Sequence, residues 1–224
     1  MKKKIIKIII LVAFIIFIYS LVNIIIWNRD NDKSEKLKIK TNDIIKNNSD
    51  PAKALLYVNP DIVGHIYVPD TSISYVVVQG KDNDYYLKHD LSKEYNRSGW
   101  IFADYRNRLD GTDKNIIIYG HDSMFSSLKN VMSENWHKKN KYISLNINDS
   151  DYMYEVFSIY ETPKEDYYLK TDFNGDFDKF VSDLKNKSVY DFGVSISSSD
   201  HILTLSTCSH SGASRIVLHA KKIN

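Results

Sequence analysis

The stretch HILTLSTCSHSGASRIVLHA spans residues 201–220 and contains the only cysteine of the chain, Cys208. Side chains of a strand alternate between its two faces, so residues two apart share a face. This alternation separates the polar positions Thr204, Ser206 and Cys208 from Leu203, Leu205 and Thr207. A small, polar run then leads to a second strand pattern that starts at Arg215. The stretch therefore predicts two neighbouring strands whose pairing brings Cys208 and Arg215 close together.

Similar short apolar runs occur throughout the chain from residue 57 onwards and are separated by polar turns. They are rich in Ile, Val, Tyr and Phe, which favour strands. The eight runs are GHIYV, SISYVVV, GWIFA, NIIIYG, KYISLNI, YMYEVFSIY, HILTLST and RIVLHA. Their number predicts a mainly β domain, an antiparallel barrel or sandwich. Two interruptions, 123–136 and 176–187, have the apolar spacing of helices, and the second has a stripe typical of core packing.

The composition is that of a folded protein of one or two domains: 224 residues, 43% hydrophobic and 26% charged. A single cysteine excludes an internal disulfide framework and a cysteine-cluster zinc site. The histidines lack the compact spacing of metal ligands, and no cofactor is expected. The net charge is +2, of which the first 27 residues contribute +4, and the basic residues form no stripe. We therefore expect no nucleic-acid partner.

The N-terminus has the pattern of a membrane anchor. Residues 8–27 are almost wholly apolar and long enough to cross a bilayer, and Lys2, Lys3 and Lys4 precede them. By the positive-inside rule, this arrangement keeps the N-terminus in the cytoplasm and the rest outside the cell. A cleaved signal peptide is the alternative, but its apolar region is shorter and ends in a small-x-small site, which is missing after Trp27.

The chain thus divides into three expected parts. Residues 1–27 form the basic end and the transmembrane anchor. Residues 28–54 form a stalk and a helical segment that ends or kinks near Pro51. Residues 55–224 form the β domain.

Cys208 has two interpretations. A free cysteine is most often a small buried hydrophobic residue. Outside the cell, however, an unpaired thiol requires another explanation, of which chemical reactivity is one. A reactive thiol needs a base or a positive charge nearby and a group that stabilises the oxyanion.

His121 is the candidate base, because it directly follows the strand pattern NIIIYG, where Gly120 allows the chain to turn. His210, two residues after Cys208, is the rival. His65 and His219 lie within strand patterns, where histidines are usually structural. Arg215 is the candidate charge partner, because its guanidinium stays protonated and binds anions in a fixed planar geometry.

These residues resemble those of the sortases, the membrane-anchored cysteine transpeptidases of Gram-positive bacteria. TLSTC with Arg215 seven residues later is similar to the TLxTC…R signature of that family, and YGH at 119–121 is similar to its catalytic histidine segment. VGHIYVPDTSISYVVVQGKDNDYYLKHD and SGWIFADYRN resemble the class B branch, which also has a helix before the seventh strand, here 176–187. The resemblance covers roughly residues 55–224.

The resemblance implies a closed eight-stranded barrel and a Cys-His-Arg site. In it Cys208 would be the nucleophile, His121 the general acid and base, and Arg215 the group that holds the oxyanion and positions the substrate. Ser206 would have a supporting role. The implied reaction cleaves a Pro-x-Thr-type sorting signal of secreted proteins through a thioacyl-enzyme. It then transfers the protein to an amine of peptidoglycan or its precursor.

Two other functions remain compatible with the sequence. A cysteine peptidase would use water as the second nucleophile. An anchored module without enzymatic activity would bind an extended peptide along a sheet edge or groove.

Overall fold

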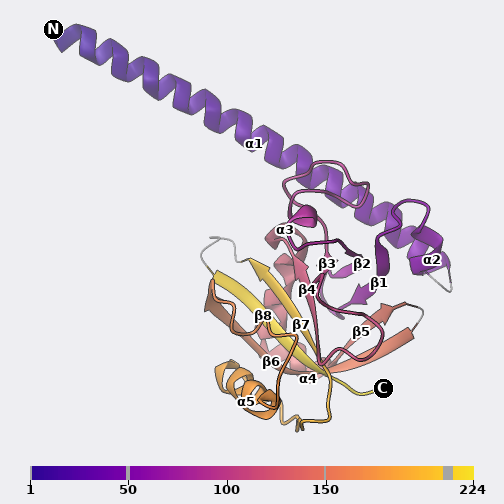
Figure 1. Ribbon diagram of the computed structural model, residues 1–224. Coiled ribbons are helices and arrows are strands. Elements are labelled where there is room, and N and C mark those ends of the chain that lie inside the picture. Colours follow the sequence, from indigo (N-terminus) through magenta and orange to yellow (C-terminus); the bar gives the residue numbers. More distant parts are fainter. Residues whose placement is uncertain (1, 49–50, 149, 209–213) are drawn as a thin grey trace.

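The computed structural model describes residues 2–48, 51–148, 150–208 and 214–224 (Figure 1). Eight strands close into a barrel in the order β1-β2-β3-β4-β7-β8-β6-β5. They are β1 (Ile62–Tyr67), β2 (Ser74–Gln79), β3 (Phe102–Ala103), β4 (Asn115–Gly120), β5 (Tyr142–Ile147), β6 (Ser150–Pro163), β7 (Ile202–Cys208) and β8 (Ser214–Lys222). The closed eight-stranded barrel expected from the resemblance is confirmed.

The barrel is mixed. β2 pairs with β3, and β4 with β7, in the parallel direction, whereas the other pairs are antiparallel. The expectation of a purely antiparallel sheet was therefore wrong for these two pairs. Parallel strands need long crossover connections, and alternation within a strand carries no information on the direction of its neighbour.

Two apolar clusters lie on opposite sides of the sheet. The first fills the barrel and includes the inward residues of β7 and β8, Leu203, Leu205, Ile216 and Leu218. The second lies outside the barrel, where α5 (Phe177–Lys187) covers the outer face of the sheet with Phe177, Phe180, Val181 and Leu184. The helix predicted for 176–187 and its core-packing role are confirmed. The connection between β6 and β7 thus forms a second layer over the face that carries Thr204 and Ser206.

The segment 123–136, predicted as one helix, consists of shorter pieces. α3 (Asp122–Phe125) is followed by a 3₁₀ segment, η2 (Ser126–Met132), and by α4 (Glu134–Lys139). Ser133 has an extended backbone, and its hydroxyl accepts a hydrogen bond from the backbone N–H of Trp136, so it caps a new helix. Met124, Leu128 and Val131 are buried as the apolar spacing indicated, although no single helix presents them.

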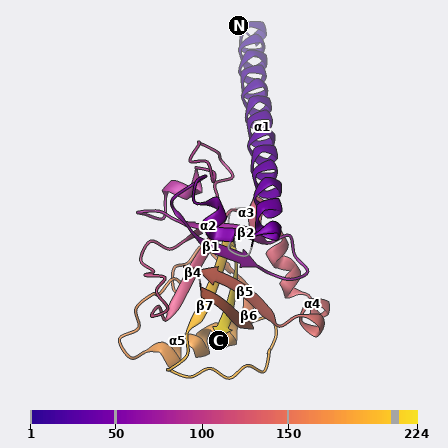
Figure 2. The ribbon, with the colours of Figure 1, turned by 90° about the vertical axis from the view of Figure 1, so that its right-hand side faces the viewer.

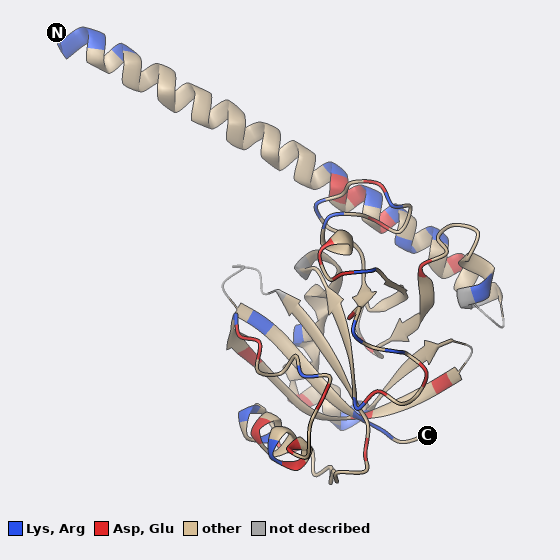
Figure 3. Cartoon of the chain, viewed as in Figure 1, with Lys and Arg blue, Asp and Glu red and all other residues tan. Residues whose placement is uncertain are grey.

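The N-terminal half of the chain's first helix extends away from the barrel. α1 (Lys2–Asn47) is continuous, and a short helix, α2 (Pro51–Leu55), follows it. Within the described residues, α1 is the one helix long and apolar enough to cross a membrane. Figure 2 shows it leaving the barrel at the end opposite to α5, and Figure 3 shows the uncharged stretch between a basic tip and a charged C-terminal part.

Candidate active site

Strand pairing brings three sequence-predicted residues to one edge of the sheet. Cys208 is the last residue of β7, and Arg215 is its register partner on β8. On the other side of β7, the parallel ladder with β4 ends at the pair Gly120–Thr207, one residue before His121. His121 and Cys208 each follow this last pair by one residue. β7, which ends in Cys208, thus lies between β4, which leads to His121, and β8, which carries Arg215.

The junction between β4 and α3 fixes the position of His121. Its carbonyl oxygen accepts hydrogen bonds from the backbone N–H groups of Met124 and Phe125, both at 2.9 Å. A Cβ atom on Gly120 would lie 2.6 Å from Cγ of Phe125, so only glycine permits this packing. His121 is half-buried, and its Nδ1 atom is buried. The backbone of His121 is consequently fixed at the end of the strand by this turn.

Arg215 lies at the start of β8, between Cys208 on β7 and Thr162 on β6. Its side chain is half-buried, and Nη1 donates a hydrogen bond to the carbonyl oxygen of Ser214 at 3.2 Å. Its charge also acts on Tyr168, a residue of the β6–β7 connection. Burial raises the pKa of Tyr168, while a hydrogen bond with Ser206 and the charge of Arg215 lower it in part.

Ser206 lies on the outward face of β7, beneath the second layer. It is only 4% exposed, and its hydroxyl lies 3.1 Å from that of Tyr168. This contact ties β7 to the β6–β7 connection two residues before Cys208. The geometry therefore gives Ser206 a positioning contact.

A buried polar chain lies further along this face. Nε2 of His219 lies 3.0 Å from the hydroxyl of Tyr160, and Nδ1 lies 2.9 Å from that of Thr204. Thr204 in turn donates to Oδ1 of Asn115 at 2.7 Å. Because the threonine proton is used there, Nδ1 of His219 is the donor and Nε2 the acceptor. Burial lowers the pKa of His219 to about 3, which keeps the ring neutral.

The structural interpretation of two histidines is therefore confirmed. His219 is satisfied by hydrogen bonds on both nitrogens, and Nε2 of His65 lies 3.1 Å from the hydroxyl of Ser74. Burial also lowers the pKa of His65 to about 4. The rival base, His210, lies outside the described residues.

A second polar cluster beside β4 was not predicted from the sequence. Asp104 is fully buried after β3, and Arg106 donates to both its carboxylate oxygens at 2.8 and 2.7 Å. The hydroxyl of Tyr119, two residues before His121, donates to the same carboxylate at 2.7 Å. Although burial opposes it, these hydrogen bonds lower the pKa of Asp104 below its ordinary value.

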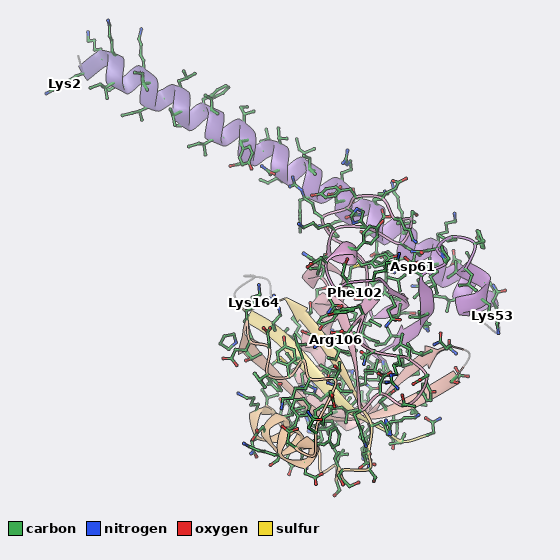
Figure 4. The ribbon with its side chains drawn as sticks, viewed as in Figure 1. Lys2, Lys53, Asp61, Phe102, Arg106 and Lys164 are labelled. Carbon is green, nitrogen blue, oxygen red and sulfur yellow. The ribbon has the colours of Figure 1, made fainter. Side chains whose placement is uncertain are left out.

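Arg106 also joins this cluster to the second layer. Its Nη2 donates to the carbonyl oxygen of Leu169 at 3.0 Å. Figure 4 labels Arg106 and Phe102, the β3 residue that precedes this segment. The cluster thus connects the end of β4 to the segment that carries Tyr168. The signal available in the sequence was the acid–base pair in ADYRN directly after a buried strand, which alone does not distinguish a structural clamp from a solvated loop.

The edge of the sheet thus combines a cysteine, an imidazole and a guanidinium at adjacent strand positions. These are the groups that acyl transfer through a thiol requires: a nucleophile, a proton carrier and a stabiliser of negative charge. An arginine is suited to the last task because it remains charged over the whole accessible pH range.

Comparison with known proteins shows the family of the chain. The family model described as the sortase domain matches residues 66–223. The chain is 36% identical to sortase B of Staphylococcus aureus over 98% of its own length and 96% of the relative's. It is 40% identical to sortase B of Listeria monocytogenes over 71% and 67% of the two chains.

A solved structure of sortase B from B. anthracis, in complex with AAEK1, superposes with a TM-score of 0.80 at 35% identity and covers 88% of this chain and 99% of that one. Sequence family, fold and topology agree over nearly the whole chain. The protein belongs to the sortase family and is a sortase-type cysteine transpeptidase similar to class B.

Proposed function

We propose that this chain cleaves a Pro-x-Thr-type sorting signal of secreted proteins and transfers the protein to an amine of peptidoglycan or its precursor. Cys208 is the nucleophile, His121 the general acid and base, and Arg215 the oxyanion-stabilising group. The observation that carries the proposal is the register that pairs Cys208 with Arg215 and ends the β4–β7 ladder one residue before His121.

In the first half-reaction, the Cys208 thiolate attacks the carbonyl carbon of the substrate threonine. The electron pair of the carbonyl moves to oxygen, and the guanidinium of Arg215 stabilises that oxyanion. As the oxyanion collapses, the C–N bond breaks and protonated His121 donates its proton to the leaving amine. A thioester between Cys208 and the threonine carbonyl remains.

In the second half-reaction, an acceptor amine attacks the thioester. Neutral His121 takes the proton from the attacking nitrogen, the C–S bond breaks, and the Cys208 thiolate is restored. The cycle exchanges one amide bond for another and needs no oxidant, metal or other cofactor. Each proton that His121 gives in the first half-reaction returns to it in the second.

The relatives support the choice of substrates. A solved S. aureus sortase B is described as a substrate complex, and another sortase B as complexed with triglycine, a peptide with a free amine. The Pro-x-Thr preference follows the class B similarity. The acceptor in this protein is an amine of the same chemical kind, on a cross-bridge residue or on the side chain of diaminopimelate.

The location of the enzyme belongs to the same proposal. The N-terminal part of α1 crosses the cell membrane once, with the four lysines at its tip in the cytoplasm and the barrel outside. Enzyme, signal-bearing substrate and wall precursor then share one membrane surface, which raises their effective concentration.

The test is product analysis with the full chain in detergent micelles. Pro-x-Thr peptides are incubated with and without triglycine, and the products are identified by mass. The proposal predicts that triglycine shifts the product from the free acid to the amide. A cysteine peptidase would give the acid in both cases, and a binding module would leave every peptide intact.

A further inference from the structure

The face of α1 that docks on the barrel begins within the apolar run of the helix. Half-buried or buried positions recur on it every three or four residues, as expected for one helix face, and include Asn23, Ile26, Asp30, Ser34, Leu37 and Thr41. The first two precede Trp27, the last residue of the apolar run. Part of the barrel therefore lies beside the last turns of the apolar run, the segment expected to cross the membrane.

The part of this face between Asn23 and Ser34 contacts the barrel segment 85–98, here called the membrane-facing loop. Nδ2 of Asn96 donates to the carbonyl oxygen of Asp30 and to the hydroxyl of Ser34, both at 3.1 Å. Lys33 pairs with the buried carboxylate of Asp90 at 2.8 Å. Buried side chains of the loop and of α1, joined by several hydrogen bonds, fix the loop against the helix.

Arg97 makes the contact that sets the depth of the loop. Its backbone N–H donates to Oδ2 of Asp30 at 3.2 Å, while its Nη1 donates to Oδ1 of Asn23 at 3.0 Å. At 1.5 Å per helical residue, Asn23 lies about 6 Å inside the outer end of the apolar run, and Asp30 lies about 4.5 Å outside it. If the apolar run spans the bilayer as proposed above, the guanidinium lies at the boundary between headgroups and hydrocarbon.

The pairing also accounts for an asparagine in an apolar segment. Nδ2 of Asn23 donates to the carbonyl oxygen of Tyr19 at 2.8 Å, and Oδ1 accepts from Arg97. An amide without such partners is costly in hydrocarbon. Both ends of the Asn23 amide are satisfied only while the membrane-facing loop lies against the helix.

The exposed residues of the loop have the chemistry of a membrane interface. Tyr95 is 62% exposed, Leu87 41% and Tyr85 37%. The ring of His89 stacks on that of Tyr85 at 4.0 Å and meets Tyr95 edge-on at 6.1 Å. Aromatic residues concentrate at the headgroup level of bilayers, where an amphipathic ring is favoured over a position in water.

We propose that the membrane-facing loop is seated in the phospholipid headgroup layer, with Arg97 linking Asn23 to lipid phosphate and Tyr95 and Leu87 inserted beside it. The proposal rests on the membrane anchorage proposed above and adds a second contact to it. With two contacts, the barrel has one fixed orientation on the bilayer. Figure 1 shows the arrowheads of β4 and β7 at the end of the barrel from which the N-terminal half of α1 extends, so the catalytic edge faces the membrane.

The test measures the depth of three nitroxide labels in the full chain, reconstituted into vesicles of phosphatidylcholine and phosphatidylglycerol. The labels are attached to Tyr95→Cys, Ile16→Cys and Tyr57→Cys in a Cys208→Ala background, which leaves one thiol in each protein. Ile16 lies in the middle of the apolar run, and Tyr57 is 76% exposed just beyond α2, at the far end of α1. Accessibility to oxygen and to a water-soluble nickel chelate reports the depth of each label.

The proposal predicts hydrocarbon depth for the label at 16, headgroup depth at 95 and water at 57. The loop contact is overturned if the label at 95 is as accessible to the chelate as the label at 57 while the label at 16 lies in hydrocarbon. That result would leave the membrane anchor intact. If the label at 16 is itself in water, the anchor fails and the loop proposal fails with it.

Substitution of Arg97 tests the phosphate contact separately. Arg97→Gln should make the label at 95 about fivefold more accessible to the chelate, because one cationic contact with an anionic surface is lost. Arg108→Gln is the matched control, because Arg108 is exposed on the segment between β3 and β4, and it should change nothing. Equal accessibility in wild type and Arg97→Gln would overturn the role of Arg97.

Discussion

Arg215 is the residue whose proposed role depends most on shape as well as charge. A guanidinium offers several N–H donors in one plane, whereas the ammonium of lysine is a compact charge on a flexible stem. Arg215→Lys should therefore lower kcat/KM by about 100-fold, the usual loss when one oxyanion donor is removed. Steady-state cleavage of a signal peptide measures this effect. Near wild-type activity in Arg215→Lys would show that charge alone is sufficient.

His219 makes the stability of the fold dependent on pH. Burial lowers its folded pKa to about 3, whereas the unfolded side chain titrates near 6.5, so only the unfolded chain takes up this proton between those values. Stability contributed by neutral His219 is complete above pH 6.5 and decreases as the pH falls towards 3. The loss approaches about 1.4 kcal/mol per pH unit.

The measurement is urea unfolding of the full chain in micelles from pH 7.5 to 5. His219→Gln keeps one donor and one acceptor for Thr204 and Tyr160 but cannot titrate, so its stability should decrease less steeply with falling pH. His65, whose pKa burial lowers to about 4, is unchanged in both proteins and contributes equally. Parallel pH profiles for the two proteins would contradict this assignment.

Single residues differed in how much the sequence revealed about them. Cys208, His121 and Arg215 could be singled out because strand alternation and chain turns limit where their side chains project. The partners of Asp104 could not, because Arg106 and Tyr119 reach it through a loop and a neighbouring strand. The spacing of these three residues along the chain therefore does not predict their contact.

At the scale of elements, the turn from β4 into α3 determines where His121 lies. Gly120→Ala would force Cβ against the ring of Phe125 and should cost about 1–3 kcal/mol of stability, as overpacking usually does. It should also lower kcat/KM, because the strand end must shift. Urea unfolding and peptide cleavage measure the two effects.

Gly175→Ala is the matched control for that experiment. Gly175 has a φ of +92° and open space around its Cβ position, so alanine adds backbone strain there without contacts. The control should lose stability but keep kcat/KM. If Gly120→Ala loses no more activity than Gly175→Ala, the turn does not position His121.

The clamp between Asp104 and Arg106 joins the β3–β4 segment to the β6–β7 connection. Arg106→Gln leaves a buried carboxylate with fewer donors and should destabilise the fold by about 1–3 kcal/mol. In the double variant with Asp104→Asn the buried charge is gone, so the combined loss should be smaller than the sum of the two single losses. Urea unfolding of all four proteins gives this coupling. Additive losses would mean that the pair is not coupled.

Elements were predicted best where their pattern is local. The eight strand runs and the helix at 176–187 follow from alternation and from an apolar stripe. The break of 123–136 into three pieces could not be predicted, because Ser133 adopts an extended backbone. The parallel pairing of β4 with β7 could not be predicted either, because tertiary packing determines which strands are neighbours. Yet that parallel pairing sets the strand end that leads to His121 next to the strand that ends in Cys208.

At the scale of the whole molecule, α1 is both a candidate membrane span and a structural element of the barrel. The sequence indicated the apolar run and a helical stalk as separate parts. The structure shows one helix, Lys2–Asn47, whose polar half docks through Asp30, Ser34 and Thr41. The docking of Asp30 and Ser34 depends on Asn96 and Arg97, far away in the sequence, and could not be predicted from the helix alone.

Intact mass spectrometry of the full chain with Pro-x-Thr peptides tests whether Cys208 carries the acyl group between two amines. We predict an added mass equal to the N-terminal peptide fragment, absent in Cys208→Ala and discharged when triglycine is added. Two results would contradict this prediction. One is amide product formed by the Cys208→Ala protein. The other is amide product formed by the wild type with no adduct at Cys208 on any timescale of turnover.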